Sequence, residues 1–280
     1  MKFLIIIPAH NEEEFIFSCL ESLQKQSFQD FKCVIVNDGS TDKTQEIVEN
    51  FISQNLKFKI QNLKLSSHEP GAKVVQTFYK GLNEIGLKDF DVICKFDSDI
   101  IFPDNYLEKI NKVYEQNPKA GMVSGLVYIE KNNDWIFENL SSKNHVRGPI
   151  KSYRKKCFEE MNGLRAVLGW DNLDVLLAKK NNWEIITIKD LWVKHLRPTA
   201  FKYKTQKAKK LGEYFYNIGL SFPLMLISSA KSSLKNKSIS EFFIIAKSFL
   251  NQKNDLIINK EEIQFIRNLR WKEMWKNFKN

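Results

Sequence analysis

Four short strand-like runs, three of them largely apolar, each followed by polar residues and a helical pattern, constrain the fold of this chain more than any other feature. The runs cover residues 2–7, 31–36, 58–65 and 92–96, and the helical patterns between them end near residues 26, 51 and 85. Short runs with little polar alternation are typical of strands buried on both faces of a sheet. The alternation of strand and helix therefore predicts a doubly wound α/β sheet.

Two aspartates, Asp97 and Asp99, directly follow the fourth run. Ligands of open α/β sheets bind at the carboxyl ends of the strands, so both carboxylates are expected where a ligand lies. Carboxylates this close repel each other unless a cation lies beside them, and Mg²⁺ or Mn²⁺ prefers carboxylate oxygens together with substrate phosphates. From the motif alone, a solvated turn leading into Pro103 explains the pair equally well.

The rest of the chain has a different pattern. We expect a helix over 106–116, a strand over 121–129, a polar irregular segment over 135–146, a strand and short helix over 147–163, a helix after 171, and strands over 183–188 and 191–195. Beyond residue 198 only helices are expected, over 204–229, 239–250 and 261–278. The change in composition near residue 200 is the candidate domain boundary.

The charge is concentrated after that boundary. Residues 201–280 contain 16 Lys and Arg against 6 Asp and Glu, a net charge of +10, whereas residues 1–200 contain 27 of each. Such a tail suits an anionic membrane surface or a nucleic acid, or is simply a solvated basic face. Its helices combine apolar and aromatic residues with lysines, which predicts reversible peripheral membrane binding. Packing on the α/β domain, or a dimer contact, is the alternative.

Several classes of protein are disfavoured. The chain has neither a G-x-G-x-x-G nor a G-x-x-x-x-G-K-[ST] sequence, which disfavours dinucleotide enzymes and P-loop NTPases. No apolar run approaches the length of a membrane-spanning helix, and the first residues lack the features of a signal peptide, so we expect a cytoplasmic protein. Cys19, Cys33, Cys94 and Cys157 are widely spaced and are expected to be reduced core residues.

Six segments in register resemble the GT-A glycosyltransferases of family 2. They are IPAHNEEEFI, VNDGSTDKT, PGAKVVQTFYKGL, KFDSDI, RGPIKSYRKKCFEEMNGL and GWDNLDVLLAKK. The resemblance covers residues 3 to about 200 and continues weakly towards residue 220. It implies a GT-A catalytic domain over 1–200, with a nucleotide-sugar-binding half (1–100) and an acceptor-binding half (101–200), followed by a basic helical extension over 201–280.

The resemblance also implies a donor site. Asp38 matches the aspartate that hydrogen-bonds the nucleobase, and His10 matches a ring that lies against the base, although a turn residue bound to the backbone is the alternative. The implied donor-binding residues are Pro8, His10, Asn11, Glu13, Asp38, Gly71, Lys73, Asp97 and Ser98. The implied metal ligands for Mn²⁺ or Mg²⁺ are Asp99, Asp97 and His195.

The catalytic base and the acceptor site follow from the later segments. Asp171 matches the catalytic aspartate, but Trp170 stands where a glutamate usually precedes it, so Asp174 remains the alternative base. Either aspartate could instead cap the helix that follows. The implied acceptor-binding residues are Arg147, Gly148, Asn162, Gly163 and Trp170.

Together these residues predict a metal-dependent, inverting glycosyltransferase. The donor is a nucleotide-diphosphate sugar, a UDP-sugar first, and the acceptor a glycan or a lipid-linked molecule of cell-envelope polysaccharide or glycolipid synthesis. The metal neutralises the diphosphate and one carboxylate accepts the proton of the attacking hydroxyl. A GT-A-like nucleotidyltransferase and a non-enzymatic basic module that binds nucleic acid are the alternatives, although no nucleic-acid partner is expected. Oligomerisation is left open.

Overall fold

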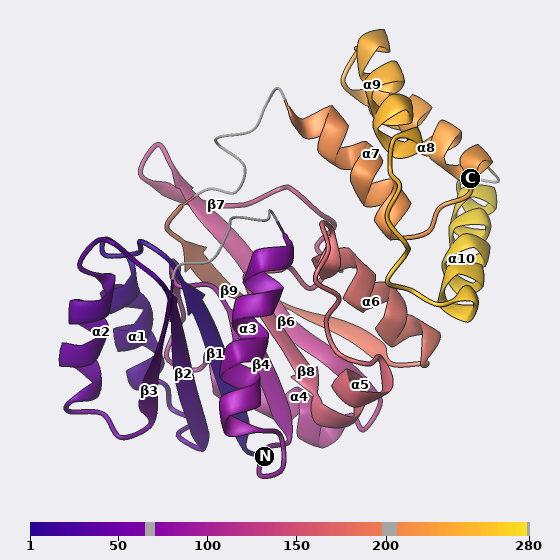
Figure 1. Ribbon diagram of the computed structural model, residues 1–280. Coiled ribbons are helices and arrows are strands. Elements are labelled where there is room, and N and C mark those ends of the chain that lie inside the picture. Colours follow the sequence, from indigo (N-terminus) through magenta and orange to yellow (C-terminus); the bar gives the residue numbers. More distant parts are fainter. Residues whose placement is uncertain (65–70, 198–205, 279–280) are drawn as a thin grey trace.

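A twisted sheet with helices on both faces forms the centre of the molecule (Figure 1). The computed structural model describes residues 1–64, 71–197 and 206–278. The strands are β1 (Phe3–Ala9), β2 (Phe31–Asp38), β3 (Phe58–Leu63), β4 (Val92–Phe96), β5 (Ile100–Ile101), β6 (Ala120–Lys131), β7 (Asp134–Phe137), β8 (Ile150–Arg154) and β9 (Glu184–His195). The helices are α1 (Ile16–Gln24), α2 (Thr44–Ile52), α3 (Ala72–Ile85), α4 (Tyr106–Gln116), α5 (Lys155–Glu160), α6 (Trp170–Lys180), α7 (Lys207–Asn217), α8 (Phe222–Lys235), α9 (Ile239–Leu250) and α10 (Lys260–Phe278).

The sheet has a parallel half and a mixed half. Its strand order is β3-β2-β1-β4-β8-β6-β9-β5, and β7 pairs with β6. The first four strands in this order are parallel, with Ile5 of β1 opposite both Cys33 and Cys94. Strand β8 is antiparallel to β4 and β6, whereas β6 and β9 are parallel. The predicted α/β class with a sheet flanked by helices is confirmed.

Strand β1 shows why the apolar runs carry so much information. Leu4 and Ile6 belong to the apolar cluster on the α3 side of the sheet, whereas Phe3, Ile5 and Ile7 belong to the cluster on the α1 side. Both faces of the strand are buried, so successive residues are all apolar. All four cysteines are buried and free, as expected from their spacing.

Four elements differ from the sequence-based expectation. The two-residue strand β5, which pairs antiparallel with β9, was not expected. Strand β7 forms inside the segment expected to be irregular, because it pairs antiparallel with the end of β6. Strand β9 is continuous where two strands were expected. The long helix expected over 204–229 is two helices, because Gly219 adopts a left-handed φ of 71° after α7 and Pro223 lies in the first turn of α8. Residues 204 and 205 lie outside the described residues.

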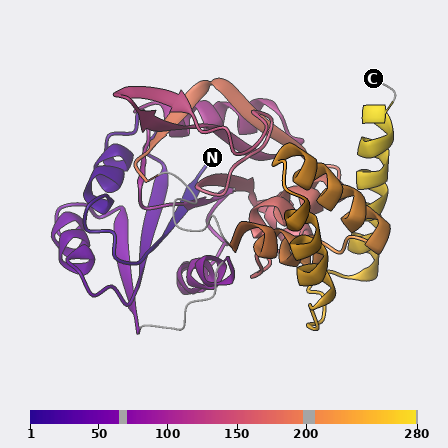
Figure 2. The same cartoon turned by 90° about the horizontal axis from the view of Figure 1, so that it is seen from above.

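The last four helices lie at the end of the molecule opposite α1 and α2 (Figure 2). Phe215, Leu224, Ile245 and Ile266 join the same apolar cluster as α3 and α6. Arg165 and Glu262 form an ion pair of 3.2 Å across this contact. The predicted boundary at residue 200 falls outside the described residues and stays a prediction.

Within the described ranges, we find no helix that is both long enough and apolar enough to span a bilayer.

Candidate active site

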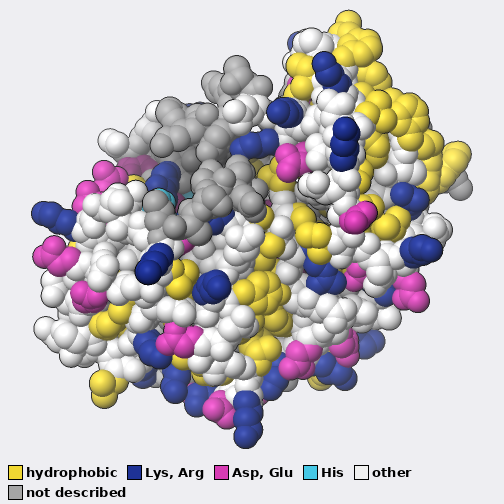
Figure 3. Space-filling view, viewed as in Figure 1, with side chains coloured by type: hydrophobic (Ala, Val, Ile, Leu, Met, Phe, Trp, Pro, Cys, Tyr) yellow, Lys and Arg dark blue, Asp and Glu magenta, His cyan; other side chains and the backbone are white. Residues whose placement is uncertain are grey.

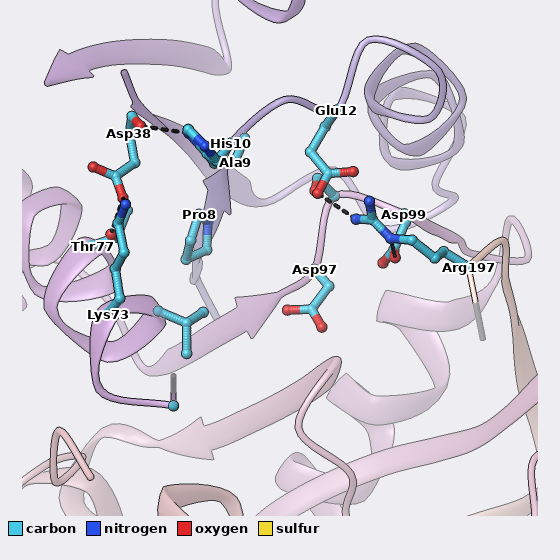
Figure 4. Close-up of a pocket in the computed structure, with 13 residues that line it drawn as sticks. Pro8, Ala9, His10, Glu12, Asp38, Lys73, Thr77, Asp97, Asp99 and Arg197 are labelled. Atoms are coloured by element: carbon cyan, nitrogen blue, oxygen red, sulfur yellow. Dashed lines mark hydrogen bonds and ion pairs between the residues drawn. The ribbon is translucent and has the colours of Figure 1, made fainter. Parts of the chain in front are cut away.

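A pocket of about 280 Å³ opens at the carboxyl ends of β1, β2 and β4 and at the first turns of α3 (Figure 4). These three strands are neighbours in the sheet, so polar residues far apart in the sequence meet there. The lining residues are Pro8, Ala9, His10, Glu12, Asp38, Gly71, Lys73, Val74, Thr77, Asp97, Ser98, Asp99 and Arg197. The pocket thus brings together seven of the nine predicted donor-binding residues, and Asp99 beside them.

At one end of the pocket, Asp38 is held by α3. Lys73 Nζ lies 3.0 Å from Asp38 Oδ2, and the Thr77 hydroxyl donates to the same oxygen at 3.4 Å. His10 Nδ1 lies 2.8 Å from the backbone carbonyl oxygen of Asp38, which corresponds to the alternative of a turn residue bound to the backbone. This end therefore presents a buried carboxylate, an ammonium group and an imidazole to the pocket.

Gly71 allows α3 to begin close to the loop that precedes α6. Its φ is 80°, and a Cβ at this position would lie 2.9 Å from the Leu168 Cα. Only glycine adopts this conformation and tolerates this approach without strain. The start of α3 therefore packs directly on the loop before α6, with no side chain between them.

Asn11 and Glu13 do not line the pocket. Asn11 Oδ1 accepts a hydrogen bond from the Thr41 backbone N–H at 2.8 Å, and Glu13 Oε2 accepts one from the Lys43 N–H at 3.0 Å. Both residues fix the loop between β2 and α2. In this structure they support the loop that follows Asp38.

At the other end of the pocket, Asp99 lies in a network of charges. Its Oδ2 is 3.5 Å from His195 Nε2 and 3.4 Å from Arg197 Nε. Arg197 also forms an ion pair with Glu12, and His195 Nδ1 lies 3.1 Å from Glu138 Oε2. His195 thus lies behind Asp99, outside the pocket lining, with both ring nitrogens next to carboxylates.

The pKa values of Glu12 and His195 are both raised within this network. Burial raises the pKa of Glu12 to about 7, although the hydrogen bond and the charge of Arg197 oppose the shift. Burial alone would lower the pKa of His195, but hydrogen bonds to Asp99 and Glu138 outweigh it and raise the pKa to about 9. A protonated His195 therefore compensates the buried carboxylates around it.

Within the described ranges, the side chains of Asp97 and Asp99 bind different partners. Asp97 forms an ion pair with the buried Lys95. Among the residues that the structure describes, no three His, Cys, Asp or Glu side chains are arranged to hold a metal ion together. Nevertheless, Asp99 Oδ1 and Glu12 Oε2 are buried without a hydrogen-bond partner among the described residues, and such oxygens fit a divalent cation.

The predicted base region begins with Trp170. The Nζ atoms of Lys95 and Lys151 lie 5.2 and 5.6 Å from the centre of its ring. Lys95 also donates to the Gly148 carbonyl oxygen at 3.4 Å. The buried lysines therefore connect Asp97 with the start of α6 through the face of one indole.

The two candidate bases have different surroundings. Asp174 is 1% exposed and accepts hydrogen bonds from Lys151 Nζ at 2.7 Å, Tyr153 OH at 2.5 Å and the Val175 N–H at 2.6 Å. Burial raises its pKa to about 6. Asp171 is only partly buried in the first turn of α6, and its backbone carbonyl accepts from Lys151. The Asp174 carboxylate is thus buried and hydrogen-bonded to neighbouring groups of the protein.

The remaining acceptor-site candidates are dispersed around α6. A Cβ on Gly148 would lie 3.5 Å from the Asp171 carboxylate. Arg147 forms a buried ion pair with Glu138. Asn162 and Gly163 form a left-handed turn, with φ of 55° and 68°. Asparagine adopts this conformation more readily than most other residues with a side chain, so the turn forms at little cost.

Six residues of this region were not predicted as site residues: Glu12, Thr77, Lys95, Glu138, Lys151 and Arg197. Lys95 and Lys151 did carry a signal, because a charged residue inside a buried strand requires a partner. Glu12 belongs to an acidic cluster that suits a first helical turn equally well. No local pattern distinguishes the other three.

A comparison with known protein families identifies the family to which this chain belongs. The family described as glycosyl transferase family 2 matches residues 4–165, more than half of the chain. The chain therefore belongs to glycosyl transferase family 2, as the resemblance predicted.

Two curated relatives are similar over part of their length. The poly(ribitol-phosphate) beta-N-acetylglucosaminyltransferase TarS of Staphylococcus aureus is 42% identical over 73 residues, which are 25% of this chain and 13% of that protein. Glycosyltransferase GlyA of Streptococcus pneumoniae is 27% identical over 195 residues, 61% of this chain and 27% of that protein. The chain thus spans less than a third of the length of either relative.

Solved structures share the fold. Residues 1–349 of S. aureus TarS in complex with UDP have a TM-score of 0.59 at 18% identity, with 93% of this chain and 95% of that chain covered. The mannosyltransferase PcManGT of Pyrobaculum calidifontis in complex with GDP-Man and Mn²⁺ has a TM-score of 0.60 at 17% identity, with 97% and 74% covered. At this identity the likeness establishes the GT-A fold alone.

Proposed function

We propose that this chain is a metal-dependent, inverting glycosyltransferase that moves a sugar from a UDP-sugar to a glycan or a lipid-linked acceptor. The observation that carries the proposal is that one pocket, at the carboxyl ends of three neighbouring strands, is lined by Asp38, Lys73, Asp97 and Asp99 together. The TarS complexes with UDP and UDP-GlcNAc support a UDP-sugar as donor. Family membership favours sugar transfer over a nucleotidyltransferase or a nucleic-acid-binding module.

The pocket has a nucleoside end and a diphosphate end in this proposal. Asp38 would accept a hydrogen bond from the base, and Lys73, 3.0 Å from Asp38, would move towards the phosphates. Lysine is a strong point charge for phosphate oxygens. Arg197, on the other side of the pocket, would exchange part of its contact with Glu12 and Asp99 for the diphosphate.

The metal-binding residues are expected at the diphosphate end. Asp99 and Asp97 would hold Mn²⁺ or Mg²⁺, with His195 adjoining, because Asp99 Oδ1 is a buried oxygen without a partner among the described residues. When bound, the ion would neutralise the diphosphate leaving group as a Lewis acid. Asp97 would have to turn from Lys95, which still retains the Gly148 carbonyl oxygen and the face of Trp170.

Asp171 is the base in this proposal. It lies partly exposed in the first turn of α6, next to Gly148, where a Cβ would lie 3.5 Å from the carboxylate. Asp171 would accept the proton of the acceptor hydroxyl while that oxygen attacks the anomeric carbon and the bond to the diphosphate breaks. One displacement inverts the configuration. Lys151 donates to the Asp171 backbone carbonyl and to the Asp174 carboxylate, which favours Asp171 over Asp174 as the base in this proposal.

We further propose that the enzyme acts in cell-envelope polysaccharide or glycolipid synthesis, in the cytoplasm at the inner face of the membrane. Relatives that transfer sugars to poly(ribitol-phosphate) support the acceptor class.

A screen of UDP-, GDP- and dTDP-sugars with Mn²⁺ tests the donor. We expect UDP-sugars to raise the melting temperature and to be hydrolysed slowly without acceptor. Activity with GDP-sugars alone would overturn the choice of nucleotide, and the absence of any nucleotide-sugar effect would overturn the proposal.

A further inference from the structure

The exposed apolar side chains of the described residues are concentrated in the C-terminal helices. Of thirteen large hydrophobic residues that are exposed, nine lie between Phe222 and Trp275. Figure 3 shows hydrophobic side chains gathered along the edge of the molecule that α8 and α9 form. Contiguous exposed apolar surface on a folded protein usually marks an interaction site.

Helix α9 is apolar on all sides but covered on only one. Eight of its twelve residues are apolar, and its inner side packs on α7, where Ser248 Oγ donates to the Lys209 carbonyl oxygen at 2.6 Å. On the outer side, Phe243 is 64% exposed and Leu250 is 62% exposed. A helix that is hydrophobic all round is normally buried, so the outer side of α9 lacks a covering partner among the described residues.

A groove of about 590 Å³ continues this surface between α8 and α10. Ile227 and Leu234 of α8 form one wall, and Met274 and Arg270 of α10 form the other. Lys231 lies on the α8 wall between the two apolar residues. The groove is therefore mainly apolar, with Lys231 on one wall and Arg270, which is paired with Glu273 at 3.2 Å, on the other.

The charges of this surface are mostly positive. Residues 221–254 contain five lysines and one acidic residue, Glu241. Glu241 is used between α8 and α9, where it accepts from Ser232 Oγ at 2.7 Å and from Asn236 Nδ2 at 2.9 Å. Lys247 lies between Phe243 and Leu250 on the outer side of α9, since residues four and three apart share a helix face.

We propose that the outer surface of α8 and α9, defined by Ile227, Lys231, Leu234, Phe243, Lys247 and Leu250, binds an anionic lipid leaflet. The apolar side chains would enter the interface while the lysines reach the headgroup phosphates. A second copy of the chain is a poorer occupant, because two such surfaces would bring positive charges together. The inference rests on the proposed membrane location and not on sugar transfer, so lipid binding is tested independently of activity.

Flotation of the full chain with phosphatidylcholine vesicles, with and without phosphatidylglycerol, is the test. We expect recovery with the anionic vesicles, little recovery with the neutral ones, and a loss of binding in high salt. Because each lysine near an anionic leaflet contributes about fivefold, Lys231→Gln with Lys247→Gln should lower the partition coefficient about 25-fold. Phe243→Ser with Leu250→Ser should also lower it.

Matched controls lie on the α/β part of the chain. Leu56→Ser removes a fully exposed leucine and Lys112→Gln an exposed lysine of α4, and both variants should bind as the wild type does. Equal recovery on neutral and anionic vesicles, recovery on neither, or unchanged binding of both double variants would overturn the proposal. So would a dimer in solution that Phe243→Ser with Leu250→Ser converts to monomer without any effect on vesicle binding.

Discussion

Replacing Asp174 and Asp171 separately by asparagine should distinguish folding from turnover. Asp174 accepts from Lys151, Tyr153 and the Val175 N–H while it is 1% exposed. An asparagine keeps one acceptor oxygen and leaves the Lys151 ammonium buried without a counter-charge. Removing one partner of a buried pair costs about 3–5 kcal/mol, so Asp174→Asn should lower the free energy of unfolding by that amount.

The same change at Asp171 should leave the fold intact. The contact of Asp171 with Lys151 is made through its backbone carbonyl, which asparagine retains. We expect a change in the free energy of unfolding of less than about 0.5 kcal/mol, as for most partly exposed sites. Loss of the proton acceptor should lower sugar transfer about 10² to 10⁴-fold with UDP affinity unchanged.

Urea unfolding followed by circular dichroism gives the stability of each variant, and calorimetry with UDP and a donor-turnover assay give the two functional readings. If Asp174→Asn folded as stably as the wild type and lost turnover while Asp171→Asn kept it, Asp174 would be the base.

Three further predictions concern neighbouring groups. Burial and Lys151 lower the pKa of His145 to about 4, below its unfolded value, so its contribution to stability is present above pH 6.5 and is lost as the pH falls. In urea unfolding, the free energy of unfolding of His145→Gln relative to that of the wild type should therefore rise by about 2 kcal/mol between pH 8 and pH 5. A difference between the two proteins that does not depend on pH would contradict this. Gly71→Ala should lower the melting temperature and weaken UDP binding because its Cβ would meet Leu168 at 2.9 Å in addition to the backbone strain of a φ of 80°. Gly86→Ala, with a φ of 77° and no atom within 4 Å of the added Cβ, should cost only the backbone strain, about 1–3 kcal/mol, and leave UDP binding unchanged; equal costs would refute the steric argument. Trp170→Leu should lower kcat and leave the donor KM unchanged, and Trp170→Phe should restore part of kcat by offering the two lysines an aromatic face; identical kinetics of the two variants would exclude this role.

The sequence predicts the parallel half of the sheet because burial on both faces requires a short, largely apolar segment, and such a segment is visible in the sequence. Each of the runs at 2–7, 31–36 and 92–96 is apolar apart from one lysine, and from residues 3, 31 and 92 onward each lies within a strand of the structure. Polar residues directly after these runs lie at one edge of the sheet, which is why Asp38, Asp97 and Asp99 could be assigned to one pocket.

Contacts between residues that are far apart in the sequence produce no such local pattern. Arg197 reaches Glu12 across 185 positions, and Lys151 of strand β8 reaches Asp174 of helix α6. Strand β7 forms only because β6 offers it an edge. These features depend on how the second half of the sheet closes on the first, and the periodicity of a segment does not encode it.

Calorimetric titration of UDP into the wild type and into Asp99→Ala, each with Mn²⁺ and with a chelator, tests the central claim most directly. Asp99 is 5% exposed and its Oδ1 has no partner among the described residues, so the account assigns the metal to this carboxylate. We predict that the wild type binds UDP more tightly with Mn²⁺ than with chelator, and that Asp99→Ala loses this difference. The absence of UDP binding by the wild type, or an unchanged effect of Mn²⁺ in Asp99→Ala, would contradict the account.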